Sequence, residues 1–384
     1  MEDNNLIIGI DARGLDANKT GISTYIDKIM QKFNEINNKE NIKFILYSTR
    51  EIQLSFKNNE NIELKILKKK KKGVIFTRYI LPKILKKDNV NIFWGTQHLL
   101  PARNKYTKDI KFILTVHDLA IHRLKIVGSK KNTIIHKLFF KKCCKDADFI
   151  IAISKSTKMD LMELFNIKEE KIKVIYLGTN FTNNYDLTKE KEEDILKKFN
   201  IENKNYLFFI STIEPRKNIT TIVKAFEDFK NKNKNDNLKL ILAGGLGWKY
   251  KNIIKTIDNS KYKQDINLVG YISEQEKLCL FHNTKGFIYP SLYEGFGMPI
   301  LEAFKNDAIV ITSDVSSMPE VGGDAAFYLK NVKDEIELSD LIKRVNLLDE
   351  NEKKEIIEKG HNQIDKFTWE KCSNETLDII KQFI

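Results

Sequence analysis

Residues 286–304 read GFIYPSLYEGFGMPILEAF, and this stretch contains one strand, one turn and one helix start. The run Gly286–Tyr289 is short and apolar, as expected of a buried strand. Gly295 and Gly297 follow in the turn, and Pro299 stands where the first turn of a helix is expected. Small residues let a ligand approach the backbone, and the N–H groups of a helix start favour an anionic or hydroxyl-rich ligand. The stretch therefore predicts a binding turn at the carboxyl end of a strand.

The same alternation of short apolar runs and helix-length segments fills the rest of the chain. The segment 22–33 places its apolar residues at offsets of three and four, which builds the apolar stripe of a helix. Two consecutive arrays of this kind predict an α/β protein with two parallel, doubly wound sheets, in which ligands bind at the carboxyl ends of the strands. The expected strands are 6–10, 43–47, 111–116, 149–153 and 172–175 in the first array, and 206–210, 239–243, 266–269, 286–289 and 308–312 in the second.

The length supports two domains of similar size, because 384 residues exceed the ~150 that one domain usually contains. The boundary is expected near residue 185, in a polar stretch rich in Lys and Asn between the two arrays. We therefore expect a first Rossmann-like domain over 1–185 and a second over 186–365, followed by a C-terminal helix over 366–384 that packs back on the first domain. Two such domains facing one another would define a cleft.

Composition and charge exclude several classes of protein. With 42% hydrophobic and 30% charged residues the chain can bury a core, so it is neither disordered nor collagen-like. The net charge of +13 indicates nucleic acid, an anionic membrane surface or a phosphorylated small molecule as partner. Residues 1–190 carry +15 and the remainder carries −2, so the excess lies in the first half. A lysine-rich composition inherited from an AT-rich genome would explain that excess equally well.

Other global signals favour a cytoplasmic protein. The chain starts Met-Glu-Asp-Asn-Asn, so we expect no secretory signal, and no run approaches the ~20 apolar residues of a membrane-spanning helix. Peripheral contact with the inner face of a membrane stays open. Four cysteines, two of them adjacent at 143 and 144, fit neither a disulfide framework nor a zinc spacing. No acidic cluster indicates a divalent metal, so no metal or other cofactor is expected.

Two glutamates bracket the turn of residues 286–304. Glu294 precedes the glycines, and Glu302 follows after seven intervening residues, in what is expected to be the first turn of the helix. Such a carboxylate can accept hydrogen bonds from a diol, although an acid at a helix start is also favourable by itself. The whole segment closely resembles the donor-sugar loop of the retaining glycosyltransferases of family four.

That resemblance implies the GT-B fold, with the nucleotide-sugar donor held by the second domain and the acceptor by the first. In the family, one glutamate lies near the transferred sugar and the other at the nucleotide ribose. The resemblance suggests Glu294 for the first role and Glu302 for the second. It also places Gly295, Phe296 and Gly297 in the donor site.

A pair of adjacent cations follows the expected strand 206–210, in the segment STIEPRKN at 211–218. Arg216 offers a planar fork and Lys217 a compact charge, which suits a diphosphate, whereas a basic pair on a loop is more commonly solvated surface. In family four an arginine and a lysine grip the donor phosphates, so the resemblance gives Arg216 and Lys217 that role. Many members place the arginine about five residues before the lysine, where this sequence has Thr212.

Further candidate residues come from both halves. The resemblance suggests that Tyr271 and Ile272 frame the nucleotide base. Gly21 opens the first helix and could bring backbone N–H groups to a phosphate. His117 ends a strand, where it would orient a sugar hydroxyl or stabilise developing charge, or else form an ordinary hydrogen bond in a loop. The family places this position beside the transferred sugar. Ser154 is expected to cap a helix.

The resemblance covers the chain from about residue 7 to residue 330 and implies a metal-independent, retaining hexosyltransferase of cell-surface polysaccharide synthesis, such as that of lipopolysaccharide. The segment STIEPRKN resembles bacterial mannosyl- and rhamnosyltransferases, which favours GDP-mannose over UDP-hexose or dTDP-rhamnose as donor. The acceptor would be a glycan or a lipid-linked sugar. No serine-hydrolase elbow, zinc or kinase motif set supports another reaction. Catalysis would depend on His117, Arg216, Lys217 and Glu294.

Two rival functions remain. A related two-domain fold serves nucleotide-sugar epimerases and phosphorylases, and a basic nucleic-acid-binding protein would need exposed aromatics among its basic residues. We favour the transferase and expect no nucleic-acid partner. The lysine run 68–72 and the basic helix 130–145 suit an anionic membrane that carries a lipid-linked acceptor, at about 1 kcal/mol per basic residue, or they are simply solvated.

Overall fold

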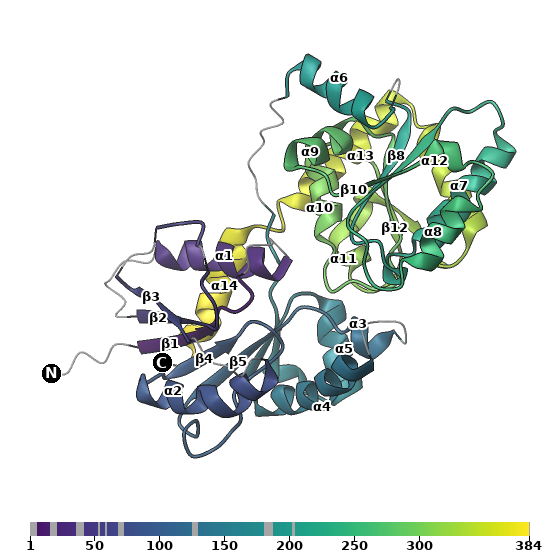
Figure 1. Cartoon of the computed structure of the whole chain (residues 1–384). Coiled ribbons are helices and arrows are strands. Elements are labelled where there is room, and N and C mark those ends of the chain that lie inside the picture. The colour runs from purple at the N-terminus through teal and green to yellow at the C-terminus, as the bar shows by residue number, and fades with distance from the viewer. Residues whose placement is uncertain are drawn as a thin grey trace. The chain divides into compact units, whose positions relative to one another are not determined.

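The chain divides into two compact units (Figure 1). The first comprises Met1–Arg123, Ser129–Gly178 and Phe367–Ile384, and the second comprises Leu124–Gly128 and Thr179–Lys366. The lysine run 68–72 and the expected boundary at residue 185 lie outside the part of the chain that the structure describes. The computed structural model describes residues 6–15, 21–35, 42–52, 54–57, 60–67, 73–124, 130–179, 187–201 and 204–383.

The first unit contains a seven-stranded sheet in the order β3-β2-β1-β4-β5-β6-β7, and neighbouring strands are parallel. The chain builds the sheet to one side of β1 and then to the other, so the strand order reverses between β1 and β4. The sequence predicts five of these strands and omits β3 and β4. The strands are β1 (Leu6–Asp11), β2 (Ile42–Ser48), β3 (Ile62–Ile66), β4 (Ile92–Gly95), β5 (Lys111–Val116), β6 (Phe149–Ala152) and β7 (Ile172–Val174).

The second unit contains a six-stranded parallel sheet in the order β10-β9-β8-β11-β12-β13, and here the order reverses between β8 and β11. The central strands are almost wholly buried because helices cover both faces, which is the environment that parallel sheets require. The sequence predicts five of the six strands and omits β13. The strands are β8 (Tyr206–Ile210), β9 (Lys239–Ala243), β10 (Ile266–Gly270), β11 (Gly286–Tyr289), β12 (Val310–Ser313) and β13 (Ala326–Leu329).

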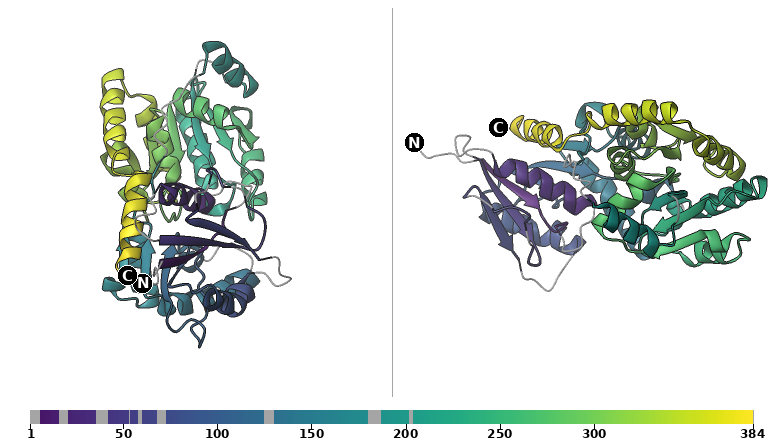
Figure 2. Two further views of the ribbon diagram at one scale, coloured as in Figure 1. Left: turned by 90° about the vertical axis from the view of Figure 1, so that its left-hand side faces the viewer. Right: turned by 90° about the horizontal axis from the view of Figure 1, so that it is seen from above.

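Helices of the second unit form two layers. On one face α12 packs against α7, which packs against α8, and on the other face α10 packs against α13 (Figures 1 and 2). The α-helices of the first unit are α1 (Gly21–Asn34), α2 (Leu81–Lys87), α3 (Ala120–Arg123), α4 (Lys130–Asp146), α5 (Lys155–Phe165) and α14 (Trp369–Lys381). Those of the second are α6 (Lys189–Lys198), α7 (Ile219–Lys232), α8 (Lys251–Asp258), α9 (Glu274–Asn283), α10 (Met298–Lys305), α11 (Met318–Gly322), α12 (Glu335–Asn346) and α13 (Glu350–Ile364).

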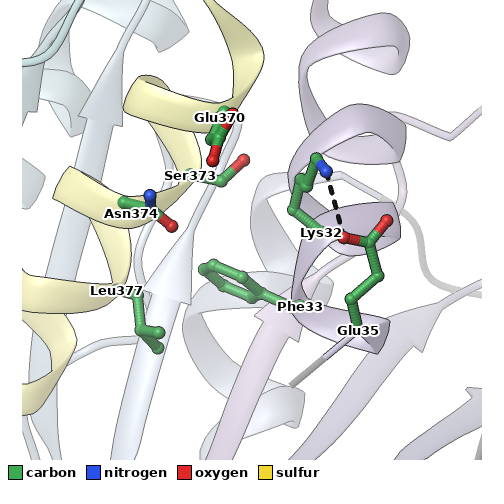
Figure 3. Close-up of a pocket in the computed structure, with 7 residues that line it drawn as sticks. All are labelled: Lys32, Phe33, Glu35, Glu370, Ser373, Asn374 and Leu377. Carbon is green, nitrogen blue, oxygen red and sulfur yellow. Dashed lines mark hydrogen bonds and ion pairs between the residues drawn. The ribbon is translucent and has the colours of Figure 1, made fainter.

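The C-terminal helix α14 belongs to the first unit, where it lies beside α1. The apolar stripe of α1 is buried as its spacing predicts, through Tyr25, Ile29 and Phe33 among others. The two helices leave a hollow of about 210 Å³ between them, with an ion pair of 3.0 Å between Lys32 and Glu35 at its edge (Figure 3). None of the predicted site residues lines this hollow.

Candidate active site

Two turns of the second unit come together where its strand order reverses. β8 pairs with β9 on one side and with β11 on the other, so the turns after β8 and β11 lie side by side at the carboxyl edge of the sheet. The backbone N–H of Leu292 donates to the carbonyl oxygen of Arg216 at 2.8 Å and ties the turns together. Residues 77 positions apart in the sequence are thereby placed in contact.

Glu294 lies at the centre of a buried ion cluster. Its Oε1 accepts from Nζ of Lys217 at 2.6 Å, and its Oε2 accepts from Nη1 of Arg216 at 2.7 Å. A second carboxylate, that of Glu214, lies 3.0 Å from Nε of Arg216. Lys217 is only 5% exposed, so water screens this pair poorly. The structure therefore brings three of the four predicted catalytic residues together, with one cation on each oxygen of the carboxylate.

The charges of the cluster stabilise one another. Burial alone raises the pKa of the Glu294 carboxyl, but Lys217 and Arg216 outweigh burial and lower that pKa to about 2. Burial lowers the pKa of Lys217, and Glu294 more than compensates, so the Lys217 pKa lies above its ordinary value. Both groups are therefore ionised at neutral pH. Such a buried pair is costly to break unless another anion takes the place of the carboxylate.

Asn218 and Gly297 shape the two turns. Asn218 has φ +61°, a left-handed conformation that asparagine tolerates, and it is the N-cap of α7. Its side-chain amide donates to the carbonyl oxygens of Pro290 at 3.1 Å and Val332 at 2.5 Å, which fixes the turn after β8 against that after β11. Gly297 has φ +117° and is the N-cap of α10, so the turn there requires glycine. Pro299 lies in the first turn of α10, as predicted.

Two serines hold the backbone of the Glu294 turn. The N–H of Glu294 donates to Oγ of Ser316 at 3.2 Å. Oγ of Ser317 lies 3.0 Å from the carbonyl oxygen of Glu294 and 2.5 Å from that of Phe296. The predicted donor residues Gly295, Phe296 and Gly297 are all buried in this turn. The backbone of the turn is thus fixed independently of the side-chain cluster.

Glu302 lies apart from the cluster. It is the fifth residue of α10, so the expectation that it lies in the first turn is wrong. The reason is that Gly297 caps the helix and Met298 begins it, which puts Glu302 in the second turn. Its carboxylate lies 3.4 Å from Nζ of Lys277 on α9. Burial raises the pKa of Glu302, and Lys277 opposes that rise. Among the described residues, no hydrogen bond joins Glu302 to Glu294.

Tyr271 presents an exposed ring at the same edge of the sheet. It follows β10 directly and is 90% exposed, although large aromatic side chains are usually buried. The ring lies against Gly245, where a Cβ atom would lie only 2.5 Å from it. Ile272 beside it is half-buried. An exposed ring over a glycine can stack on a planar ligand, which fits the predicted contact with a base.

Hydrogen bonds and a ring contact within the first unit hold His117 in place. Its Nε2 lies 2.9 Å from the carbonyl oxygen of Thr96, so this nitrogen carries a proton and donates. Its backbone N–H donates to Nε2 of His98 at 2.8 Å, and its ring packs edge-on against Tyr25. Burial lowers the pKa of His117, so the ring is neutral at pH 7. This geometry matches the hydrogen-bonded loop histidine and leaves Nδ1 as an acceptor.

Other residues at strand and helix ends of the first unit include the predicted Gly21 and Ser154. Gly21 is the first residue of α1, and no atom of the described residues beyond its chain neighbours lies within 4 Å of the position of a Cβ there. Asp11 and Arg13, after β1, form an ion pair of 2.5 Å. The predicted cap at Ser154 is confirmed, because its side chain accepts from the N–H of Thr157 at 3.0 Å.

Sequence reasoning missed several residues of the second-unit site. Tyr289 touches both Lys217 and Glu294, at 2.7 Å and 3.0 Å from its hydroxyl oxygen. In the sequence it is simply the last residue of an apolar strand. Its place at the carboxyl end of that strand is the signal that could have identified it, because the side chains that face a ligand lie there.

The described residues contain neither a candidate metal site nor a candidate membrane-spanning helix. No group of three or more His, Cys, Asp or Glu side chains is placed to hold a metal ion together. No helix in the described ranges is both long and apolar enough to cross a bilayer.

Comparison with known proteins connects this geometry to a family. Residues 190–363 match the model of the glycosyl transferases group 1, and residues 58–182 match that of glycosyltransferase family 4. The O-antigen chain mannosyltransferase B of Escherichia coli is 26% identical over 295 residues, which are 76% of this chain and 74% of that protein. The O-antigen chain mannosyltransferase RfbU of Salmonella typhimurium is 26% identical over 265 residues, 69% of this chain and 67% of that protein.

A solved structure agrees on the fold. The glycosyltransferase from Rickettsia africae superposes with a TM-score of 0.72 at 20% identity, over 99% of each chain. The two family models together match most of the chain: the group 1 model spans all six strands of the second sheet, and the family 4 model spans β3 to β7 of the first. The chain therefore belongs to the group 1 glycosyltransferases of family four and is a glycosyltransferase with the GT-B fold.

Proposed function

We propose that this enzyme transfers mannose from GDP-mannose to a glycan or lipid-linked acceptor, with retention at the anomeric carbon, in the synthesis of a cell-surface polysaccharide. Two relatives named as O-antigen chain mannosyltransferases support the sugar and the pathway class. The observation that carries the chemistry is the buried cluster of Arg216, Lys217 and Glu294 at the point where the strand order reverses. Open α/β sheets bind their ligands at such a point.

The leaving group determines what the two cations do. The bond between the anomeric carbon and the β-phosphate oxygen breaks, and its electron pair stays on that oxygen. Arg216 and Lys217 meet the developing negative charge from a buried position, where a fixed cation is worth more than in water. Both cations hold a carboxylate in the structure, so the donor diphosphate would replace Glu294 as their partner. Glu294 is then free to accept hydrogen bonds from the hydroxyls of the transferred sugar.

We propose a front-face route for the acceptor. The acceptor oxygen attacks the anomeric carbon from the side on which the diphosphate leaves, and the acceptor proton passes to the departing phosphate oxygen. The products are the glycosylated acceptor and the nucleoside diphosphate, and the scheme uses no metal ion or other cofactor. Neutral His117 would orient a hydroxyl through Nδ1, since its Nε2 proton is already donated. A covalent sugar–enzyme intermediate, trapped and located by mass spectrometry, would contradict this route.

The donor is tested first by a thermal-shift panel of GDP, UDP, dTDP and ADP. We expect GDP to raise the melting temperature most, because a ligand stabilises the state that binds it. Transfer from GDP-mannose is then followed by NMR of the product, and retention predicts an α-linked mannoside. Stabilisation by UDP or dTDP alone would replace GDP-mannose by a UDP-hexose or dTDP-rhamnose donor. A β-linked product would contradict retention.

We further propose that the enzyme works in the cytoplasm, at the inner face of a membrane. Leu138 of α4 is 69% exposed, and Tyr79 of the π-helix η2 (Phe76–Ile80) is 59% exposed. Arg78 joins the two elements, because it donates to Sγ of Cys143 at 3.2 Å and pairs with Asp146 at 3.0 Å, both on α4. Exposed apolar side chains among lysines suit an anionic lipid surface. The exposed lysines of α4, among its residues whose side chains the structure describes, are Lys137, Lys141, Lys142 and Lys145.

Vesicle co-sedimentation tests the membrane proposal. Vesicles of phosphatidylcholine are compared with an equal mixture of phosphatidylcholine and phosphatidylglycerol. We expect binding to the mixture only, and weaker binding of Leu138→Glu. Leu347→Glu, at a leucine of the second unit that is 65% exposed, is the matched control and should bind like the wild type. Binding that does not depend on phosphatidylglycerol would reject the proposal.

A further inference from the structure

The side chain of Tyr289 has one polar atom, its hydroxyl oxygen, and that atom lies inside the cluster formed by Arg216, Lys217 and Glu294. The residue ends β11 and is 1% exposed, and its ring stacks against Phe209 and Phe287 with centroids 6.2 Å and 5.7 Å away. Its hydroxyl oxygen accepts from Nζ of Lys217 at 2.7 Å, and the hydroxyl donates to Oε1 of Glu294 at 3.0 Å. The aromatic packing therefore fixes a hydroxyl group at a set distance from the carboxylate.

Three side chains hold the carboxylate of Glu294, and they differ in charge. Arg216 and Lys217 are cations, whereas Tyr289 is neutral, and burial raises its pKa further above the ordinary value. A diphosphate attracts the two cations strongly and a neutral hydroxyl much less. Arrival of the donor would therefore take away both cations that orient Glu294. Tyr289 cannot follow easily, because its ring stacks against two phenylalanines.

We infer that Tyr289 is a positioning residue, which holds the Glu294 carboxylate in place for the transferred sugar while Arg216 and Lys217 bind the diphosphate. The inference deepens the proposed function and depends on it for the roles of these three residues. The backbone of the Glu294 turn does not need Tyr289, because Ser316 and Ser317 hold that backbone separately. The hydroxyl of Tyr289 therefore acts on the side chains of Glu294 and Lys217 and not on the backbone of the turn.

The test is Tyr289→Phe, which removes the hydroxyl and keeps the stacked ring. Dissociation constants for GDP and for GDP-mannose are measured by calorimetry. We expect the constant for GDP to change by less than about twofold, because the cations remain, while GDP-mannose binds about tenfold more weakly and kcat falls about tenfold. A residue with a merely structural role would weaken both ligands together. Equal changes in the two constants, or no change in either, would overturn the inference.

A matched control and a double mutant sharpen the test. Tyr206→Phe removes another buried hydroxyl from the same sheet, one that donates to the carbonyl oxygen of Leu280 at 2.9 Å, and it should leave both constants unchanged. In a Glu294→Gln background, Tyr289→Phe should add less than about a twofold effect, since the two residues act as one unit. A full tenfold effect in that background would also overturn the inference.

The outcome separates this inference from the donor proposal. If the wild type turns over UDP-glucose and not GDP-mannose, the mannose donor is wrong. The same measurements are then made with UDP and UDP-glucose, and the expected difference between nucleotide and nucleotide sugar is unchanged. The role of Tyr289 stands or falls on that difference alone.

Discussion

The two points at which strand order reverses are built differently. In the second unit, charged side chains from two distant turns meet, and each cation has a carboxylate that a ligand can replace. In the first unit, Asp11 after β1 pairs with its near neighbour Arg13, and Oγ1 of Thr96 after β4 donates to the backbone carbonyl of Asp11 at 2.5 Å. His117, one strand further along, donates to another backbone carbonyl. The cations of the second unit can therefore exchange their carboxylate partners for an anionic ligand. In the first unit the corresponding polar groups are already bonded to one another or to backbone carbonyls.

Lys217→Ala should break the second-unit site with the largest effect. We expect kcat/KM to fall by about 10³-fold, because the leaving group loses a buried cation. Glu294 also loses its nearest partner, at 2.6 Å. The measurement is steady-state transfer from the donor, with circular dichroism as the check on folding. Lys224→Ala is the control. Lys224 is an exposed lysine of α7, and its replacement should leave kcat/KM nearly unchanged. Turnover close to normal would remove the phosphate role of Lys217.

Glu294→Gln should separate binding of the nucleotide from transfer of the sugar. We expect kcat to fall by about 10²-fold, because the sugar loses a charged acceptor. GDP should bind as well as before or more tightly, because Arg216 and Lys217 no longer hold a competing carboxylate. Isothermal titration with GDP and steady-state kinetics measure the two effects. Parallel losses of GDP affinity and turnover would argue against the exchange of partners.

The difference between the two units also explains what the sequence can predict. Arg216, Lys217 and Glu294 can be identified in the sequence because their segments resemble the donor-binding motifs of family four, whereas a basic pair on a loop is by itself more commonly solvated surface. Asn218 cannot, because its role depends on carbonyl groups more than 70 positions away, and Tyr289 cannot, because in the sequence it is simply the last residue of an apolar strand. Glu302 lies in the second turn of α10 because the position of the N-cap, which depends on backbone conformation at Gly297, sets the start of the helix.

Two of the three omitted strands lie at an edge of their sheet. β13 ends the second sheet, and only its last residue is fully buried. β3 is an edge strand in which Glu63 and Lys65 interrupt the apolar run, as expected for strands that face water on one side. β4 is a central, fully buried strand and is no shorter than the predicted β11, so neither its position nor its length accounts for its omission.

Gly178→Ala should weaken the first unit without touching the ion cluster. A Cβ atom there would lie 2.1 Å from the backbone nitrogen of Trp369, which is an atom that cannot move aside by rotation. We expect a loss of about 2–3 kcal/mol in the free energy of unfolding, measured by urea denaturation. Gly21→Ala is the control, because in the part of the chain that the structure describes no atom beyond its chain neighbours lies within 4 Å of the added methyl group, and it should change stability by less than about 0.5 kcal/mol. Equal stability of both variants would contradict the tight packing at Gly178.

His117 should give the smallest effect, and one that only pH reveals. Burial lowers its pKa in the folded state, so below the unfolded-state pKa of about 6.5 the unfolded chain binds a proton that the folded protein does not. Stability should therefore fall as pH drops from 7.0 to 5.5, by about 1 kcal/mol from this residue. Urea denaturation of His117→Gln should lack that part of the slope, whereas His282→Gln, at an exposed histidine, should retain it.

Glu294, with its pKa of about 2, stays ionised throughout this range, so the second-unit cluster adds nothing to the slope. Identical slopes in the wild type and His117→Gln would mean that the first-unit site is open to a proton, and the contrast between the two units would fail.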